Sequence, residues 1–281
     1  MQLNRRDRSL IIIGGHEDKE DDKLILRAVA DKVGSGRLVI VTAASNHQEE
    51  LGEAYEQLFR GLGVRHVHKL RIESREDAMS DKSLRVLEDT STVFFTGGDQ
   101  LKITSQIGMT PVCLRLQEIY ESGGTIAGTS AGASVMTETM MVSGNGKQTP
   151  RLGGGLQLAP GLGFLQGIII DQHFSERGRI GRLIDAVAQN PRILGVGIDE
   201  NTAIIVEHDN SFSVLGEGGV CVIDGASVSY TNITEEELDR TLSVYDVKLH
   251  ILSQGDRFDC RTRKPTSAPA EAIETEMLAA K

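Results

Sequence analysis

The chain has 281 residues and a formal net charge of −10, from 30 Lys and Arg against 40 Asp and Glu. This length allows a sizeable buried core, and the 39% hydrophobic content excludes an intrinsically disordered chain. The acidic balance argues against a nucleic-acid-binding protein, whose surface would be basic; it is compatible with a cationic substrate or with solubility alone.

Short apolar segments alternate with helical patterns through the first half of the chain. The expected strands are 10–13, 37–41, 64–70, 92–96 and 125–127, and the expected helices are 21–33, 49–61, 83–88 and 111–122. The helices carry apolar residues at helical spacing, and the strands are short runs that end at glycines or polar residues. This alternation predicts an α/β fold with a mainly parallel sheet flanked by helices on both faces. Ligands of such sheets bind beyond the carboxyl ends of the strands.

The second half of the chain is less regular. Residues 143–163 are rich in glycine and contain two prolines, which predicts a long loop of a kind that is often functional. Further strands are expected at 167–170, 194–198, 203–206, 212–215 and 220–223, the last three of them antiparallel. Residues 264–281 contain two prolines and little periodicity, so we expect a flexible tail there. With no repeat and no linker, a single α/β domain over 1–281 is expected.

The sequence G-T-S-A-G at 128–132 directly follows the strand expected at 125–127 and precedes a possible helix start. The pattern G-x-S-x-G between a strand and a helix is typical of a nucleophile elbow, in which glycines permit a sharp turn that exposes the serine, here Ser130. The turn also aims the backbone N–H of Ala131 at the site, where it can stabilise an oxyanion. The loop 97–99, Gly-Gly-Asp, follows another strand and is a candidate for the second donor.

A serine nucleophile needs a base, and the base needs a carboxylate that orients it. His173 follows the strand at 167–170, but His16 and His47 also follow strands, so position alone does not decide among them. Asp199 and Glu200 both follow the strand at 194–198, and either acid could orient the base.

Five segments together resemble the cyanophycinase family of serine peptidases, which is related to aspartyl dipeptidase (peptidase E) and has a fold similar to class I glutamine amidotransferases. They are GGHEDK at 14–19, FTGGDQ at 95–100, GTSAGA at 128–133, DQHF at 171–174 and GIDENTA at 197–203. The resemblance covers roughly residues 8–260, with the segments in matching order. One departure is His16, where the family's GG-x-EDK segment is expected to carry a small residue.

The resemblance implies a catalytic triad of Ser130, His173 and Glu200, with oxyanion-hole donors at Gly98 and Ala131. The substrate-binding residues that it implies are Gln100, Asp171, Gln172, Arg177 and Arg182. The implied reaction is exopeptidase hydrolysis of cyanophycin, a poly-aspartate with an arginine on each side chain, to β-Asp-Arg dipeptides through an acyl-enzyme. A homodimer is also implied. The chain has no metal-ligand spacing, and neither a metal nor another cofactor is expected.

These roles agree with the chemistry of the side chains. Arg177 or Arg182 could clamp the α-carboxylate of an aspartyl unit through two parallel hydrogen bonds, although both could instead lie on a solvated helix face. Asp171 and Gln172 could accept hydrogen bonds from the substrate arginine.

Two other functions compete with this one. An aspartyl or isoaspartyl dipeptidase would share the triad and differ only in the pocket. A non-catalytic small-ligand-binding module would use the glycine loops for anions, but these loops lack the spacing of phosphate-binding motifs.

The three cysteines, Cys113, Cys221 and Cys260, fit neither a disulfide framework nor a zinc pattern. The apolar run 10–13 is too short for a signal sequence or a membrane span. We therefore expect a cytoplasmic protein with no membrane or nucleic-acid partner.

Overall fold

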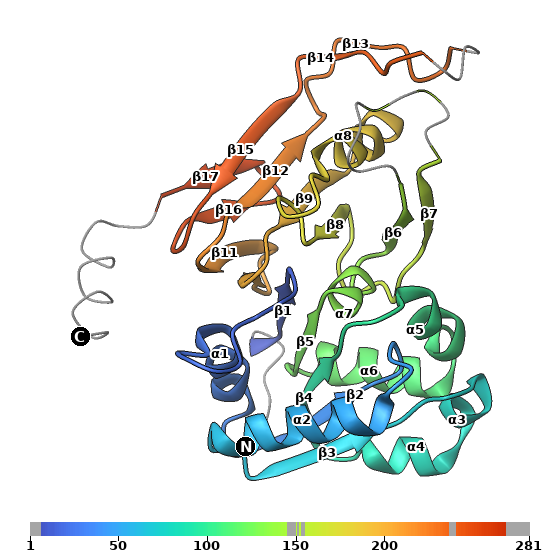
Figure 1. Ribbon diagram of the computed structural model, residues 1–281, viewed down its shortest axis with the longest axis vertical. Coiled ribbons are helices and arrows are strands. Elements are labelled where there is room, and N and C mark those ends of the chain that lie inside the picture. The colour runs from blue at the N-terminus through green and yellow to red at the C-terminus, as the bar shows by residue number, and fades with distance from the viewer. Residues whose placement is uncertain (1–6, 145–149, 151, 153–154, 236–239, 268–281) are drawn as a thin grey trace.

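Nine strands form the large sheet, in the order β17-β16-β11-β10-β1-β5-β4-β2-β3, in the computed structural model (Figure 1). The structure describes residues 7–144, 150, 152, 155–235 and 240–267. Five neighbouring strands are parallel: β1 (Ser9–Ile13), β2 (Arg37–Val41), β3 (His66–Leu70), β4 (Thr90–Phe95) and β5 (Thr125–Thr129). The other four join by antiparallel pairing: β10 (Thr202–Val206), β11 (Ser211–Gly216), β16 (Arg257–Asp259) and β17 (Lys264–Thr266).

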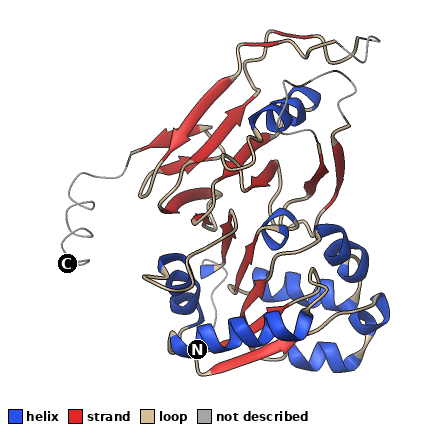
Figure 2. Cartoon of the chain, viewed as in Figure 1, coloured by secondary structure: helices blue, strands red, loops and turns tan. Residues whose placement is uncertain are grey.

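Helices cover both faces of the parallel part of this sheet (Figure 2). The helices are α1 (Leu24–Val33), α2 (Gln48–Gly61), α3 (Arg75–Met79), α4 (Asp81–Val86), α5 (Gln100–Ile107) and α6 (Pro111–Glu121). The strand β1 shows the two faces directly. Leu10 and Ile12 belong to the core that contains residues of α5 and α6, whereas Ile11 and Ile13 belong to the core beneath α1 and α2. All four side chains are fully buried, because a central parallel strand has no solvent face.

A second sheet has four strands, in the order β15-β12-β9-β8. Its strands are β8 (Ile168–Gln172), β9 (Leu194–Ile198), β12 (Val220–Asp224) and β15 (Lys248–Leu252), and α8 (Ile180–Gln189) packs on β9 and β12. Only β8 and β9 are parallel to one another. In Figure 1 this sheet lies above the parallel part of the large sheet. Two short hairpins complete the fold, β6 (Thr139–Ser143) with β7 (Gln157–Pro160) and β13 (Tyr230–Thr231) with β14 (Val244–Tyr245).

The predicted fold class is confirmed: a mainly parallel sheet between helices, with antiparallel strands added in the C-terminal third. The structure differs from the expected loop and tail. The ends of the expected 143–163 loop pair as β6 and β7, while residues 145–149, 151 and 153–154 lie outside the described residues. The expected tail begins with β17, which pairs with β16 across a turn, and its residues 268–281 lie outside the described part.

Among the described residues, no helix combines the length and apolar character that crossing a bilayer requires.

Candidate active site

Ser130, His173 and Glu200 lie in three loops, which follow β5, β8 and β9 respectively. Because β5 belongs to the large sheet and the other two strands to the second sheet, the site lies where the two sheets meet. The loop after β1 joins them: the Gly14 carbonyl accepts the His173 N–H at 2.8 Å, and the Gly15 carbonyl accepts the Asn201 N–H at 2.9 Å. The carboxyl ends of the strands thus converge as a parallel arrangement predicts.

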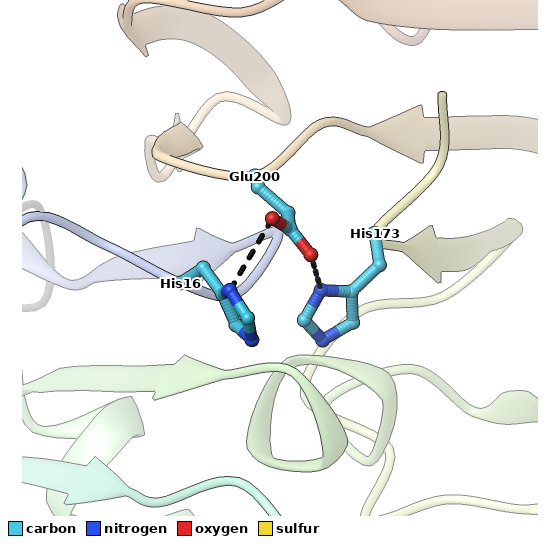
Figure 3. Close-up of side chains that lie close together, drawn as sticks. All are labelled: His16, His173 and Glu200. Carbon is cyan, nitrogen blue, oxygen red and sulfur yellow. Dashed lines mark hydrogen bonds and ion pairs between the residues drawn. The ribbon is translucent and has the colours of Figure 1, made fainter. Parts of the chain in front are cut away.

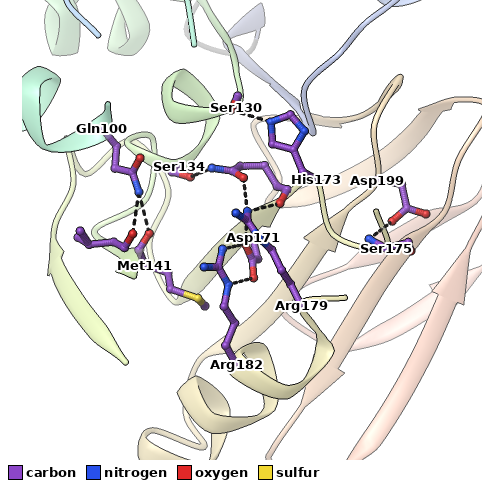
Figure 4. Close-up of polar contacts among 12 residues, drawn as sticks. Gln100, Ser130, Ser134, Met141, Asp171, His173, Ser175, Arg179, Arg182 and Asp199 are labelled. Atoms are coloured by element: carbon purple, nitrogen blue, oxygen red, sulfur yellow. Dashed lines mark hydrogen bonds and ion pairs between the residues drawn. The ribbon is translucent and has the colours of Figure 1, made fainter. Parts of the chain in front are cut away.

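A continuous hydrogen-bond chain connects the three side chains: Figure 3 shows the contact of His173 with Glu200, and Figure 4 shows that of Ser130 with His173. Ser130 Oγ lies 2.9 Å from His173 Nε2, and His173 Nδ1 lies 2.6 Å from Glu200 Oε1. An ionised carboxylate can only accept, so Nδ1 carries the hydrogen and Nε2 is left free to accept the serine proton. This is the arrangement that a serine nucleophile and its base require.

Asp199 has a different task from Glu200, so the choice between the two acids is resolved by geometry. Its Oδ1 accepts the N–H of Ser175 and its Oδ2 accepts the N–H of Gly219, both at 3.0 Å. Asp199 therefore ties together the backbone of neighbouring loops, whereas Glu200 contacts His173.

The turn at Ser130 needs both glycines of its motif for the reason predicted. A Cβ at Gly128 would lie 2.6 Å from the Gly132 carbonyl oxygen, and a Cβ at Gly132 would lie 2.4 Å from that of Phe95. Ser130 itself has φ 53°, a left-handed conformation that a non-glycine residue adopts only when its surroundings impose it. The chain then enters the short helix α7 (Ala131–Ser134).

The buried carboxylate of Glu17 supports this turn through hydrogen bonds. Glu17 accepts the Thr129 hydroxyl at 2.6 Å and the Tyr55 hydroxyl at 2.5 Å, and Lys19 Nζ lies 3.7 Å away. Burial, together with the nearby Glu17 carboxylate, raises the pKa of Tyr55 well above its usual value, so the phenol stays a donor. Since Thr129 directly precedes the nucleophile, Glu17 holds the backbone that presents Ser130.

The two expected oxyanion donors flank Ser130. A Cβ on Gly97 would lie 3.4 Å from the Ser130 Cβ, so the loop 97–98 runs beside the nucleophile. Gly98 has φ 140°, and a Cβ there would meet the Ala44 carbonyl oxygen at 2.2 Å, which explains the glycine. Among the described residues, neither the Gly98 nor the Ala131 N–H donates to a backbone carbonyl, so both are available to a ligand.

His173 is almost fully enclosed. Burial lowers its pKa below the usual value, and the Arg177 charge acts in the same direction. The hydrogen bond to Glu200 opposes this shift without cancelling it. The imidazole is consequently neutral, and able to act as a base, at a lower pH than an ordinary histidine.

Asp171 lies next to this site but points into a buried ion-pair network (Figure 4). It is 1% exposed and is held by two arginines: Arg182 Nε at 2.7 Å, with a second bond from Arg182 Nη2, and Arg179 Nη1 at 3.1 Å. Arg182 is therefore not the free carboxylate clamp that was one of two predicted choices, because Asp171 already occupies its guanidinium. Arg177, the other choice, is exposed.

The two predicted glutamines are both held by hydrogen bonds to neighbouring residues. Gln100, at the start of α5, donates to the Met141 carbonyl at 3.1 Å. Gln172 donates to the Ser134 hydroxyl at 3.3 Å and accepts from Arg179. Both amides are thereby oriented by neighbouring polar groups.

Two residues of the site were not predicted from the sequence. Arg179 joins Asp171 to Gln172, and burial lowers its pKa to about 10. Glu17 is the other, and its presence in the GGHEDK segment was the available signal.

His16 contacts the triad directly, in the segment where the sequence departs from the expected family pattern. Its Nδ1 lies 3.3 Å from Glu200 Oε2, and its ring packs edge-on against His173 with centroids 5.2 Å apart (Figure 3). In the described part of the chain, His16, His173 and Glu200 are the one group of three side chains whose arrangement could hold a metal ion.

Comparisons with known proteins identify the family. The model of peptidase family S51 matches residues 10–214. The chain is 38% identical to a cyanophycinase of Synechococcus elongatus over 258 residues, 91% of this chain and 80% of that one. It is 39% identical to a cyanophycinase of Trichormus variabilis over 253 residues, 89% and 85% of the two chains. The crystal structure of a peptidase from an acI-B1 actinobacterium shares the fold, with a TM-score of 0.67 at 22% identity over 92% of this chain and 98% of that one.

Proposed function

The chain belongs to peptidase family S51, and on this basis we propose that it is a serine-type exopeptidase that hydrolyses cyanophycin to β-Asp-Arg dipeptides. The observation that carries the proposal is the hydrogen-bond chain from Ser130 through His173 to Glu200. It supports nucleophilic catalysis, and the cyanophycinase relatives support the substrate.

Hydrolysis proceeds by two acyl transfers. Ser130 Oγ attacks the scissile carbonyl carbon while His173 Nε2 takes its proton, and Glu200 stabilises the resulting imidazolium. The N–H groups of Gly98 and Ala131 stabilise the oxyanion. His173 then gives its proton to the leaving amine, and an ester to Ser130 remains. The amine that leaves carries the terminal β-Asp-Arg dipeptide, because only the terminal aspartyl unit has a free α-carboxylate. Water attacks the ester with His173 again as base, which releases the shortened chain and restores the serine.

The substrate's charged groups are assigned to residues beside this triad. We assign the α-carboxylate of the aspartyl unit to Arg177, which is exposed and close enough for its charge to act on His173. We assign polar contacts with the substrate to Gln100 and Gln172, whose amides are oriented by Met141 and Ser134 respectively. Asp171 and Arg182 form a buried ion pair with each other, so we assign them a supporting role beside the site rather than direct contact with the substrate.

The proposal includes a cytoplasmic homodimer. All three cysteines are free thiols, as a reducing compartment favours. Burial raises the pKa of Cys221 to about 11 and that of Cys260 to about 12, so these thiols are unreactive in the folded protein.

A product assay tests the substrate. Purified protein is offered insoluble cyanophycin and, in a parallel reaction, an α-linked aspartyl dipeptide, and the products are identified by mass. Release of β-Asp-Arg from the polymer is expected. Cleavage of the α-linked dipeptide alone would overturn the substrate and favour the aspartyl dipeptidase alternative.

A further inference from the structure

Two histidines present the same ring nitrogen to one carboxylate in this site. His173 Nδ1 lies 2.6 Å from Glu200 Oε1, and His16 Nδ1 lies 3.3 Å from Glu200 Oε2. Figure 3 shows the two rings on either side of the carboxylate, each with Nδ1 turned toward it. The ligand atoms of the three side chains all lie within 4.8 Å of one another.

This grouping is close to what a tetrahedral zinc ion requires, with one adjustment: His173 Nδ1 and Glu200 Oε1, which are hydrogen-bonded at 2.6 Å, must move apart. Bonds of about 2.1 Å to nitrogen and oxygen at tetrahedral angles place ligand atoms about 3.4 Å apart. Two imidazoles and one carboxylate are also a ligand set that zinc accepts, with a fourth position open to water. The ligands come from three loops that are already fixed by backbone hydrogen bonds between Gly14, Gly15, His173 and Asn201.

An ion can reach this position from solvent. The His16 side chain is 72% exposed and that of Glu200 is 26% exposed. The His173 side chain is only 3% exposed and lies on the buried side of the group. The Glu176 carboxylate, which accepts the Glu200 N–H at 3.3 Å, adds negative charge nearby. The positive charge of Arg177, which acts on His173, repels a cation. The affinity for zinc therefore depends on the bonds to the three ligands rather than on the local charge alone.

We propose that His16, His173 and Glu200 form a site for Zn²⁺ that inhibits the enzyme; the inhibition rests on the proposed function, whereas the binding does not. Zinc takes the lone pair of His173 Nδ1, so the hydrogen of this ring moves to Nε2. That nitrogen then donates to Ser130 Oγ and can no longer accept its proton. The ring stays neutral, and no proton is lost from it. His16 supplies its Nδ1 lone pair and Glu200 its charge.

Binding is measured without turnover. The Ser130→Ala protein is titrated with Zn²⁺ against a chromophoric chelator, alone and combined with His16→Asn or His16→Ala. Asparagine tolerates the left-handed backbone of His16 (φ 48°), so this variant separates loss of a ligand from loss of folding. We expect both changes to weaken zinc binding on the order of tenfold or more. Removing a residue that binds the metal directly should cost at least as much affinity as removing a residue that only supports a ligand.

The matched control is His47→Ala. His47 is exposed and lies 3.8 Å from Glu50, and this pair belongs to no group of three possible ligands among the described residues. Removing it should leave zinc binding unchanged. Mg²⁺, which prefers an all-oxygen shell, should not compete.

Inhibition is then measured as the zinc concentration that halves cyanophycin hydrolysis, with each variant compared with its own metal-free rate. Wild type and His47→Ala should be inhibited alike and restored by EDTA, and His16→Asn should need on the order of tenfold more zinc. Equal zinc affinity in the presence and absence of His16 would overturn the inference, whatever the activity. His16-dependent binding by a protein that does not cleave cyanophycin would overturn the proposed function and leave the zinc site standing.

Discussion

The two sides of the site are positioned by different forces. On the nucleophile side, packing of main chain against main chain fixes Ser130: glycines at 128 and 132 leave no room for a Cβ, and Glu17 anchors the preceding residue. On the base side, Arg179 and Arg182 form ion pairs with Asp171 and so hold the end of β8, the strand that directly precedes His173. The nucleophile side should therefore be sensitive to added atoms, and the base side to the loss of a charge.

Removing the nucleophile should have the largest effect. Ser130→Ala deletes the attacking oxygen but adds nothing to the packed turn, so the fold should persist while turnover falls by about 10⁵- to 10⁶-fold. Cyanophycin hydrolysis and the melting temperature are measured together. Substantial turnover in this variant would contradict the role of Ser130.

Neutralising Asp171 should have the next largest effect, on stability. Asp171→Asn leaves the buried Arg182 without its anion, which should lower the free energy of unfolding by about 3–5 kcal/mol. Urea unfolding at pH 7 measures this. Glu118→Gln breaks the exposed pair with Arg115 and serves as the control, with an expected cost of about 0–1 kcal/mol. Equal costs in the two variants would show that the network does not support the base side.

Adding one methyl group should disturb the nucleophile side. In Gly132→Ala the new Cβ would meet Phe95 backbone 2.4 Å away, and we expect a loss of about 1–3 kcal/mol in stability and of about 100-fold in kcat. Gly61→Ala is the matched control, since a Cβ there meets nothing within 4 Å and should be neutral. A Gly132→Ala enzyme with wild-type kcat would show that the turn can relax.

The pH dependence should show the smallest effect, and it reports on the base side. Because burial lowers the pKa of His173, kcat/KM should fall with decreasing pH only below the ordinary histidine value of about 6.5. Glu200 raises this pKa, so residual activity in Glu200→Gln should fall at a still lower pH. Half-maximal kcat/KM above pH 6.5 in the wild type would contradict the neutral, buried base.

The nucleophile side could be predicted from sequence because its determinants are local. Five consecutive residues specify the turn at Ser130, and the steric reason for the glycines holds in the structure. The base side depends on contacts between distant segments. Arg177, Arg179 and Arg182 have the same chemistry within six positions, and only the folded chain shows that Asp171 takes two of them.

The same contrast applies to the fold. Regular alternation predicted the parallel strands, but β8 and β9 carry the same pattern and nevertheless belong to a second sheet. The segment of β17 was predicted as tail because residues 264–281 contain two prolines and little periodicity. Proline, which has no N–H to donate, is tolerated here because β17 is the edge strand of the sheet in the described part of the chain. Helix α5 was missed because only Ile103 and Ile107 are buried on it.

The central claim is that His173 activates Ser130 as a nucleophile, and covalent labelling tests it most directly. Wild-type protein is treated with a serine-directed phosphonate or sulfonyl fluoride, digested, and analysed by mass spectrometry. We expect one modified peptide, which carries the adduct on Ser130. Labelling should be strongly slowed in His173→Ala and absent in Ser130→Ala. Labelling of Ser130 at an equal rate without His173, or no labelling of Ser130 in the wild type, would contradict the central claim.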